Sequence, residues 1–162
     1  MPEYDLAFAA KLAELANEVD EKTPWAYDAR RVVIYLSRLS FEITLKALLG
    51  KAGKPLNEIR KRSHNLRQLL TDLDDCEVQI EVTPGTREWS SAACIRAVTI
   101  DLGLARVPIG DLIDAENRGV SKYPNQIRYG EAITEVDSTL LASAAILAAK
   151  WAKDNWRTIK MR

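Results

Sequence analysis

Residues 29–48 read ARRVVIYLSRLSFEITLKAL, and this stretch decides the fold class. Its apolar residues recur at the spacing of an α-helix and form two adjacent rows. One row holds Ala29, Val32, Val33, Leu36, Leu39, Ile43 and Ala47, and the other holds Ile34, Phe41, Leu45 and Leu48. A stripe this wide predicts a central helix that is buried on more than one side.

The sequence also marks the ends of this central helix. Thr23 is a good N-cap and Pro24 suits the first helical position, so we expect the helix to begin there. Gly53 followed by Pro55 is a stop signal, so we expect the helix to reach about Lys51.

Helical periodicity recurs on both sides of the central helix. We expect a first helix over residues 4–19 and a third over residues 65–73. Asn65 with Gln68 resembles a capping box at the start of the third helix, with Ser63 as an alternative cap.

A last helix is expected from Thr134, with Asp137 in the capping-box position, to about Trp156. Its many alanines would let another helix approach closely. Before it, residues 108–116 look like one or two helical turns, and residues 118–130 look like a loop.

The stretch over residues 76–102 breaks the helical pattern. Val78, Ile80 and Val82 alternate with polar residues, which is strand periodicity, and Pro84-Gly85 is a turn signal. We expect a small hairpin whose returning strand lies within residues 94–101, with a short helix over residues 88–97 as the competing interpretation.

Together these elements predict one mainly α domain over residues 1–162. It would be an up-and-down four-helix bundle with a β-hairpin or irregular insertion at about 76–102. Hydrophobic residues make up 47% of the chain and the formal net charge is zero, so nucleic-acid binding would need local basic patches.

The composition also indicates the cellular compartment in which we expect the protein. The longest apolar run, near Leu140, falls far short of the roughly 20 residues that span a bilayer. No basic stretch followed by an apolar core opens the chain, and Cys76 and Cys94 are isolated. We therefore expect a cytoplasmic protein with reduced thiols and no membrane partner. With His64 as the single histidine we expect no metal site and no cofactor.

Three segments, in order, resemble the HEPN family. Residues 39–49 (LSFEITLKALL) resemble its second helix, in which a Glu and a Lys lie one turn apart. Residues 64–70 (HNLRQLL) resemble the opening of its next helix, and KYPN at 122–125 with Arg128 and Tyr129 resembles the loop before its last helix.

The resemblance implies a helical bundle that is commonly a homodimer. Some HEPN members are metal-independent ribonucleases of toxin–antitoxin and phage-defence systems, and others are non-catalytic partners of small nucleotidyltransferases. The ribonucleases share an R-x(4–6)-H motif. Here Asn57, Glu58 and Ile59 hold those arginine positions, and Arg60 gives the shorter R-x3-H with His64.

Candidate site residues fall into three groups. His64 is the natural proton acceptor near neutral pH, and Arg60 would stabilise developing charge, so these two are the candidate catalytic pair. The candidate phosphate- or RNA-binding residues are Arg62, Arg67, Arg118, Lys122, Tyr123, Arg128 and Tyr129. Arg38, Glu42 and Lys46 form one column on the central helix and are expected to be a structural network of paired charges.

Each group also has a plainer interpretation. His64 would then cap a helix, and the loop residues would anchor the loop on the bundle. The basic run over residues 51–67 would be a solvated surface, or it would pair with the acidic run over residues 72–81.

We expect a non-catalytic HEPN-like binding module that engages a nucleotide, RNA or a protein partner. The alternative is a metal-independent endoribonuclease that uses Arg60 and His64. A purely structural helical interaction protein is a third possibility.

Overall fold

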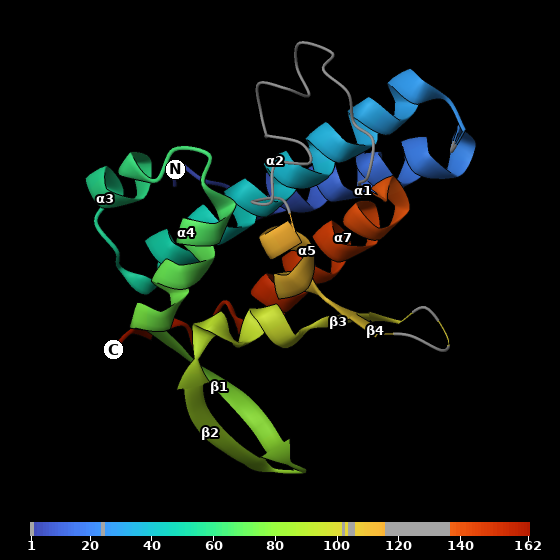
Figure 1. Ribbon diagram of the computed structural model, residues 1–162. Coiled ribbons are helices and arrows are strands. Elements are labelled where there is room, and N and C mark those ends of the chain that lie inside the picture. Colours follow the sequence, from blue (N-terminus) through green and yellow to red (C-terminus); the bar gives the residue numbers. More distant parts are fainter. Residues whose placement is uncertain (1, 24, 102, 104–105, 116–136) are drawn as a thin grey trace.

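The computed structural model describes residues 2–23, 25–101, 103, 106–115 and 137–162 (Figure 1). The chain is mainly helical with small antiparallel sheets. Three long helices, α1 (Leu6–Lys22), α2 (Tyr27–Ala52) and α7 (Ser138–Asn155), form the body, and each packs against the other two. The central helix that the sequence predicts is α2, and it is buried on two sides by α1 and α7.

Shorter helices surround this body. After α2 come α3 (Leu56–Lys61) and α4 (Leu66–Asp72), and both contact α2. The 3₁₀ turns η1 (Leu73–Asp75) and η2 (Ala92–Ala97) follow, and η2 packs against α5 (Ile109–Ala115). The predicted third helix and the predicted turns at 108–116 are therefore present, whereas α3 was not predicted.

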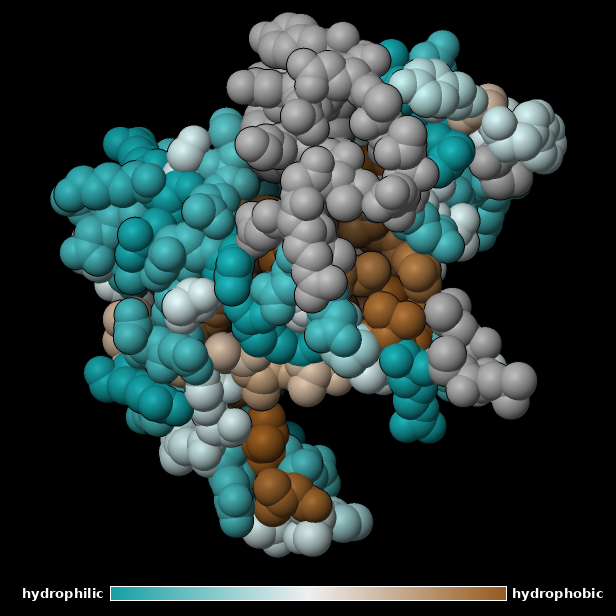
Figure 2. All heavy atoms as spheres, in the orientation of Figure 1, coloured by the Kyte–Doolittle hydropathy of each residue, from teal (hydrophilic) through white to brown (hydrophobic). Residues whose placement is uncertain are grey.

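The main sheet confirms the predicted hairpin but corrects its second strand. Its order is β2–β1–β5, from β1 (Cys76–Thr83), β2 (Thr86–Ser91) and the two-residue β5 (Lys160–Met161). The turn at Pro84-Gly85 is only two residues long, with Gly85 at φ 82°, so pairing resumes at once between Thr83 and Thr86. The hairpin projects from the helical body in Figure 1, and Figure 2 shows apolar side chains along it.

The prediction that the returning strand lies within residues 94–101 is therefore wrong. Most of that stretch belongs to η2 instead, and its end forms β3 (Thr99–Asp101), which pairs with β4 (Arg106–Pro108) in a second sheet. The competing helix over residues 88–97 is correct only for its second half, as a 3₁₀ turn.

The helix ends show a second correction, at Thr23. Helix α2 begins at Tyr27, and Thr23 instead ends α1, where its N–H and its Oγ1 both donate to the Val19 carbonyl, at 3.0 and 3.2 Å. A threonine hydroxyl can serve either end of a helix, and here α1 continues three residues past its predicted end. The predicted stop at Gly53 is confirmed, with φ 109°.

The predicted cap at Asn65 is present, and the role predicted for Asp137 is corrected. The Asn65 side chain accepts a hydrogen bond from the Gln68 N–H at 3.0 Å. Asp137 is the N-cap of α7 rather than its capping-box residue, because it accepts from the Leu140 N–H at 3.1 Å and the helix begins at Ser138. The start predicted at Thr134 lies outside the described residues.

The core lies where α2, α4 and α7 meet. Phe41, Leu45 and Leu48 of α2 are almost fully buried there. Helix α7 contributes small residues, Ala142, Ala144, Ala145, Ala148, Ala149 and Ala152, all of them buried. Small side chains let the helices pack closely, as the sequence predicted. Among the described residues, no helix is both long enough and apolar enough to cross a membrane.

Candidate functional site

A buried column of charge runs along α2. Arg38, Glu42 and Lys46 lie on successive turns and are only 1%, 5% and 5% exposed. The Lys46 Nζ donates to Glu42 Oε1 at 2.8 Å. Because burying an unpaired charge is costly, this pairing is what allows two ionised groups on a buried face. The structural pairing expected from the spacing is therefore seen between Glu42 and Lys46.

The second oxygen of Glu42 faces His64. The His64 Nδ1 lies 3.0 Å from Glu42 Oε2, and its side chain is 45% exposed. His64 lies in the turn between α3 and α4, where Ser63 has a positive φ of 50° and Asn65 caps α4. The local sequence thus shapes a turn that brings the histidine over α2. One buried carboxylate thereby fixes both a buried lysine and a half-exposed imidazole.

The N-terminal segment completes the constellation. The ring centroid of Tyr4 lies 5.1 Å from Lys46 Nζ. Beside it, Glu3 accepts hydrogen bonds from Arg60, with 2.9 Å between Arg60 Nε and Glu3 Oε1. Arg60 and His64 therefore stand at the two ends of one chain of neighbouring side chains. We call this set the Glu42 site: Glu3, Tyr4, Glu42, Lys46, Arg60 and His64.

Ionisation within the site follows these contacts. Hydrogen bonds from Arg60 hold the pKa of the Glu3 carboxyl below its usual value, and the same contact raises the pKa of Arg60. Burial, and then the charge of Glu3, raises the pKa of the Tyr4 hydroxyl. Tyr4 is therefore a neutral hydroxyl beside a charged pair.

The backbone does not put Arg60 and His64 on one helical turn. Helix α3 ends at Lys61, and the positive φ of Ser63 takes the chain out of helical geometry before His64. The two side chains are instead connected through Glu3, Tyr4, Lys46 and Glu42. The hypothesis that the R-x3-H spacing brings the two together on one helix is therefore wrong.

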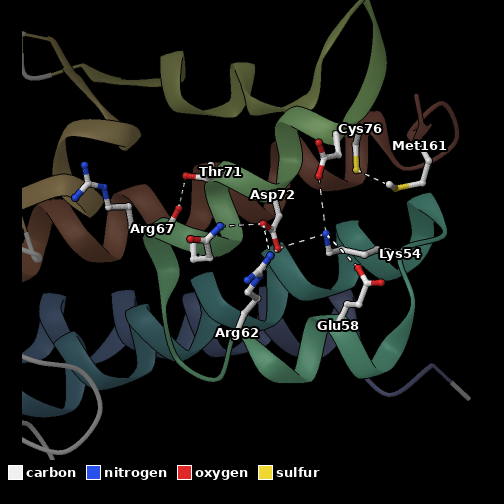
Figure 3. A network of polar contacts seen from close by, with 10 residues as sticks. Lys54, Glu58, Arg62, Arg67, Thr71, Asp72, Cys76 and Met161 are labelled. Carbon is white, nitrogen blue, oxygen red and sulfur yellow. Dashed lines mark hydrogen bonds and ion pairs between the residues drawn. The ribbon is translucent and has the colours of Figure 1, made fainter.

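A second polar network centres on Asp72 (Figure 3). Its side chain is 5% exposed and accepts from Arg62 at 2.7 and 3.1 Å and from Gln68 at 3.1 Å. The Lys54 Nζ lies 3.5 Å from Asp72 Oδ2 and also near Glu58 and Asp75. This network realises, within one chain, the pairing expected between the basic and acidic runs.

Burial alone would raise the pKa of Asp72. Hydrogen bonds from Arg62 and Gln68 and the charge of Lys54 outweigh that effect, so the pKa lies below its usual value. Asp72 is therefore an ionised carboxylate that holds the α3–α4 turn against α4. Arg62 therefore has an internal, structural role.

The remaining predicted phosphate-binding residues separate into two groups. Arg67 is exposed and lies 3.7 Å from Asp114, which also pairs with Arg96. Arg118, Lys122, Tyr123, Arg128 and Tyr129 lie outside the described residues. Of the predicted set, the structure therefore brings Arg60, His64, Glu42 and Lys46 into one site.

Sequence reasoning missed Glu3, Tyr4 and Asp72. No local pattern marks the first two, because their partners are more than forty residues away in the chain. Asp72 did carry a signal. It follows Leu69 by three positions, which places it on the apolar face of α4 beside buried leucines.

The remaining candidates for chemistry are groups of metal-ligating side chains and the two thiols. The described part of the chain contains no cluster of three or more metal-ligating side chains. Burial raises the pKa of the Cys76 thiol to about 11 and also raises that of Cys94. Both thiols are therefore protonated at neutral pH, which makes them poor nucleophiles.

Comparison with protein families, with curated proteins and with solved structures finds no match for this chain. The resemblance to the HEPN family rests on the three sequence motifs.

Proposed function

We propose that this chain is a HEPN-like binding module without catalysis of its own, and that it engages a nucleotide or RNA at the Glu42 site. The observation that carries the proposal is His64, a half-exposed imidazole whose Nδ1 is fixed by a buried carboxylate. In this proposal α1, α2, α4 and α7 correspond to the four helices of the family bundle, and the module works as a homodimer with a protein partner such as a nucleotidyltransferase.

The site offers an anionic ligand an exchangeable cation. The Arg60 side chain is 60% exposed and its partner Glu3 is one-third exposed. Exposed ion pairs contribute little to stability, because water screens them. A phosphate group can therefore replace Glu3 on Arg60 at little cost, and it gains a charge-assisted hydrogen bond.

The same contacts favour binding over cleavage. A metal-free ribonuclease needs cations that converge on the transition state beside its base. Lys46 is buried against Glu42, and Arg62 is bound to the buried carboxylate of Asp72. These two described cations are thus committed to buried carboxylates.

The test is direct binding of nucleotides and short RNAs, measured by calorimetry and as a rise in melting temperature. We expect Arg60→Gln and His64→Ala each to weaken binding roughly tenfold, the equivalent of about 1.4 kcal/mol. Arg87→Gln, which removes an exposed cation from the hairpin, is the control and should bind like wild type. Equal affinity of all four proteins would remove the Glu42 site from the proposal.

A second function, a metal-independent endoribonuclease of a toxin or defence system, is favoured by one contact. A carboxylate that orients a histidine is the arrangement used to align a general base. RNA cleavage in buffer containing EDTA, by wild type and not by His64→Ala, would establish this function and overturn the non-catalytic proposal. Absence of cleavage by both leaves the binding module.

A further inference from the structure

A groove of about 800 Å³ lies between the start of α1 and the end of α7. Its α1 wall runs from Leu6 to Glu14, which is about 12 Å of helix. Its aliphatic lining comes from Leu6, Ala7 and Ala10 of α1 and from Ile146 and Ala149 of α7. The aromatic side chains of Tyr4 and Trp156 also line it. The size lies within the range of small-molecule sites, and a long aliphatic wall suits an extended apolar chain.

One end of the groove is cationic. Lys153 and Arg157 line it, and neither has an ion-pair partner among the residues that the structure describes. Three other charged side chains line the groove, and one of them, Asp5, caps α1 and likewise has no ion-pair partner among the described residues. Lys150 is paired with Asp154 at 2.8 Å, and Glu14 is paired with Lys11 at 3.1 Å. Two unneutralised cations at the end of an apolar channel attract a negatively charged head group.

We propose that this groove binds a free single-chain amphiphilic anion, with its alkyl chain between α1 and α7 and its acidic head group at Lys153 and Arg157. Along the aliphatic stretch a nucleotide fits less well, because the polar edge of a base would lack hydrogen-bond partners there. The Asp5 carboxylate already accepts from the N–H groups of Ala7 and Phe8, and Glu14 is held by Lys11. An alkyl chain needs no such partners.

This site is separate from the proposed nucleotide or RNA site, although Tyr4 contributes to both. Tyr4 lines the groove and also stacks near Lys46 in the Glu42 site. Neither Lys153 nor Arg157 belongs to the Glu42 site. Their substitution therefore tests the groove without touching His64 or Arg60, and failure of one proposal is distinguishable from failure of the other.

The first experiment is calorimetric titration with hexanoate, octanoate and decanoate below their micellar concentrations. Each added methylene should tighten binding roughly fourfold if the chain is buried. Affinity that does not change with chain length, or no heat of binding with decanoate, would overturn the proposal. Vesicles of phosphatidylcholine with phosphatidylglycerol form a second arm, and binding to these vesicles without binding to decanoate would also overturn it.

A double variant tests the end of the groove that would hold the head group. The double variant Lys153→Gln with Arg157→Gln should weaken decanoate binding roughly tenfold, as expected for loss of charge-assisted contacts. Its control is Lys22→Gln with Arg87→Gln, which removes the same charge from exposed positions outside the groove. Equal affinity of the two double variants would rule out recognition of the head group.

Ala10→Leu tests the channel itself. Position 10 is half-buried on α1, and leucine is a good helix former, so the variant should fold. Its larger side chain should fill the groove and weaken decanoate binding at least tenfold, with the far-ultraviolet circular dichroism spectrum unchanged. Undiminished binding by a folded Ala10→Leu would place the ligand elsewhere.

Discussion

At the scale of single residues, two buried carboxylates organise this protein in different ways. Glu42 connects α2 to the turn that carries His64, and Asp72 connects that same turn to Lys54 at the end of α2. Each carboxylate is shared by two basic side chains. The turn between α3 and α4 is therefore held from both sides by contacts to buried carboxylates, and His64 has a defined position despite lying in a turn.

Asp72→Asn tests how much of the stability depends on this arrangement. The substitution leaves Lys54, whose side chain is 6% exposed, without its nearest carboxylate. Loss of one partner of a buried pair costs about 3–5 kcal/mol, and we expect about 3 kcal/mol because Glu58 and Asp75 remain close to Lys54. The free energy of unfolding in urea at neutral pH measures it.

Arg62→Gln is the control for that substitution. The Arg62 side chain is 36% exposed, and Asp72 retains Lys54 and Gln68 when the guanidinium is removed. The loss should be less than about 1 kcal/mol. Equal losses for Asp72→Asn and Arg62→Gln would show that burial of the charge on Lys54 does not determine the cost.

At the scale of elements, substitution by alanine should have opposite effects on stability at two glycines near the end of α2. Gly53 has φ 109°, where a side chain is strained, although an added Cβ would meet only Met161 Cγ at an ordinary 3.7 Å. Gly53→Ala should therefore destabilise the protein by about 1 kcal/mol through the backbone alone.

Gly50 lies inside the helix, and an added Cβ would lie 3.8 Å from Ile59 Cδ1, an ordinary contact. Gly50→Ala should stabilise the protein by about 0.5–1 kcal/mol, since alanine is the better helix former. The two melting temperatures, compared with wild type, should therefore shift in opposite directions. Shifts of the same sign would contradict the assigned end of α2.

Local signals explain which elements the sequence predicted correctly. The wide apolar stripe of α2, the stop at Gly53, the cap at Asn65 and the turn at Pro84-Gly85 all act within a few residues, and all are present. Strand β2 was missed because its sequence, Thr86–Ser91, lacks apolar alternation. It is a strand because a two-residue turn places it beside β1.

The candidate site was predictable in part for the same reason. The spacing of Glu42 and Lys46 on α2 predicted their pairing, and His64 was a candidate because it is the single histidine. The contacts of Tyr4 and Glu3 join distant segments, so no window of sequence contains both partners. The same is true of β5, which pairs with β1 from the far end of the chain.

At the scale of the whole molecule, the ionic contacts predict a specific response to acid. A carboxyl whose pKa is lowered by folding stabilises the folded state above its ordinary pKa, and that contribution is lost as the pH falls through the folded value. Asp72 is such a group, because folding lowers its pKa from an ordinary value of 3.8. The pKa of Glu3 is lowered as well. Stability should therefore hold at neutral pH and decline below about pH 4.

The difference between wild type and Asp72→Asn isolates the contribution of Asp72, because all other carboxyls are common to the two proteins. We expect the difference in unfolding free energy to be largest at neutral pH and to shrink as the pH falls below 3.8. Urea unfolding followed by circular dichroism at several pH values measures it. The difference in unfolding free energy could instead stay constant as the pH falls below 3.8. The cost of Asp72→Asn would then come from packing and hydrogen bonding, and not from the attraction of the Asp72 charge to Lys54 and Arg62.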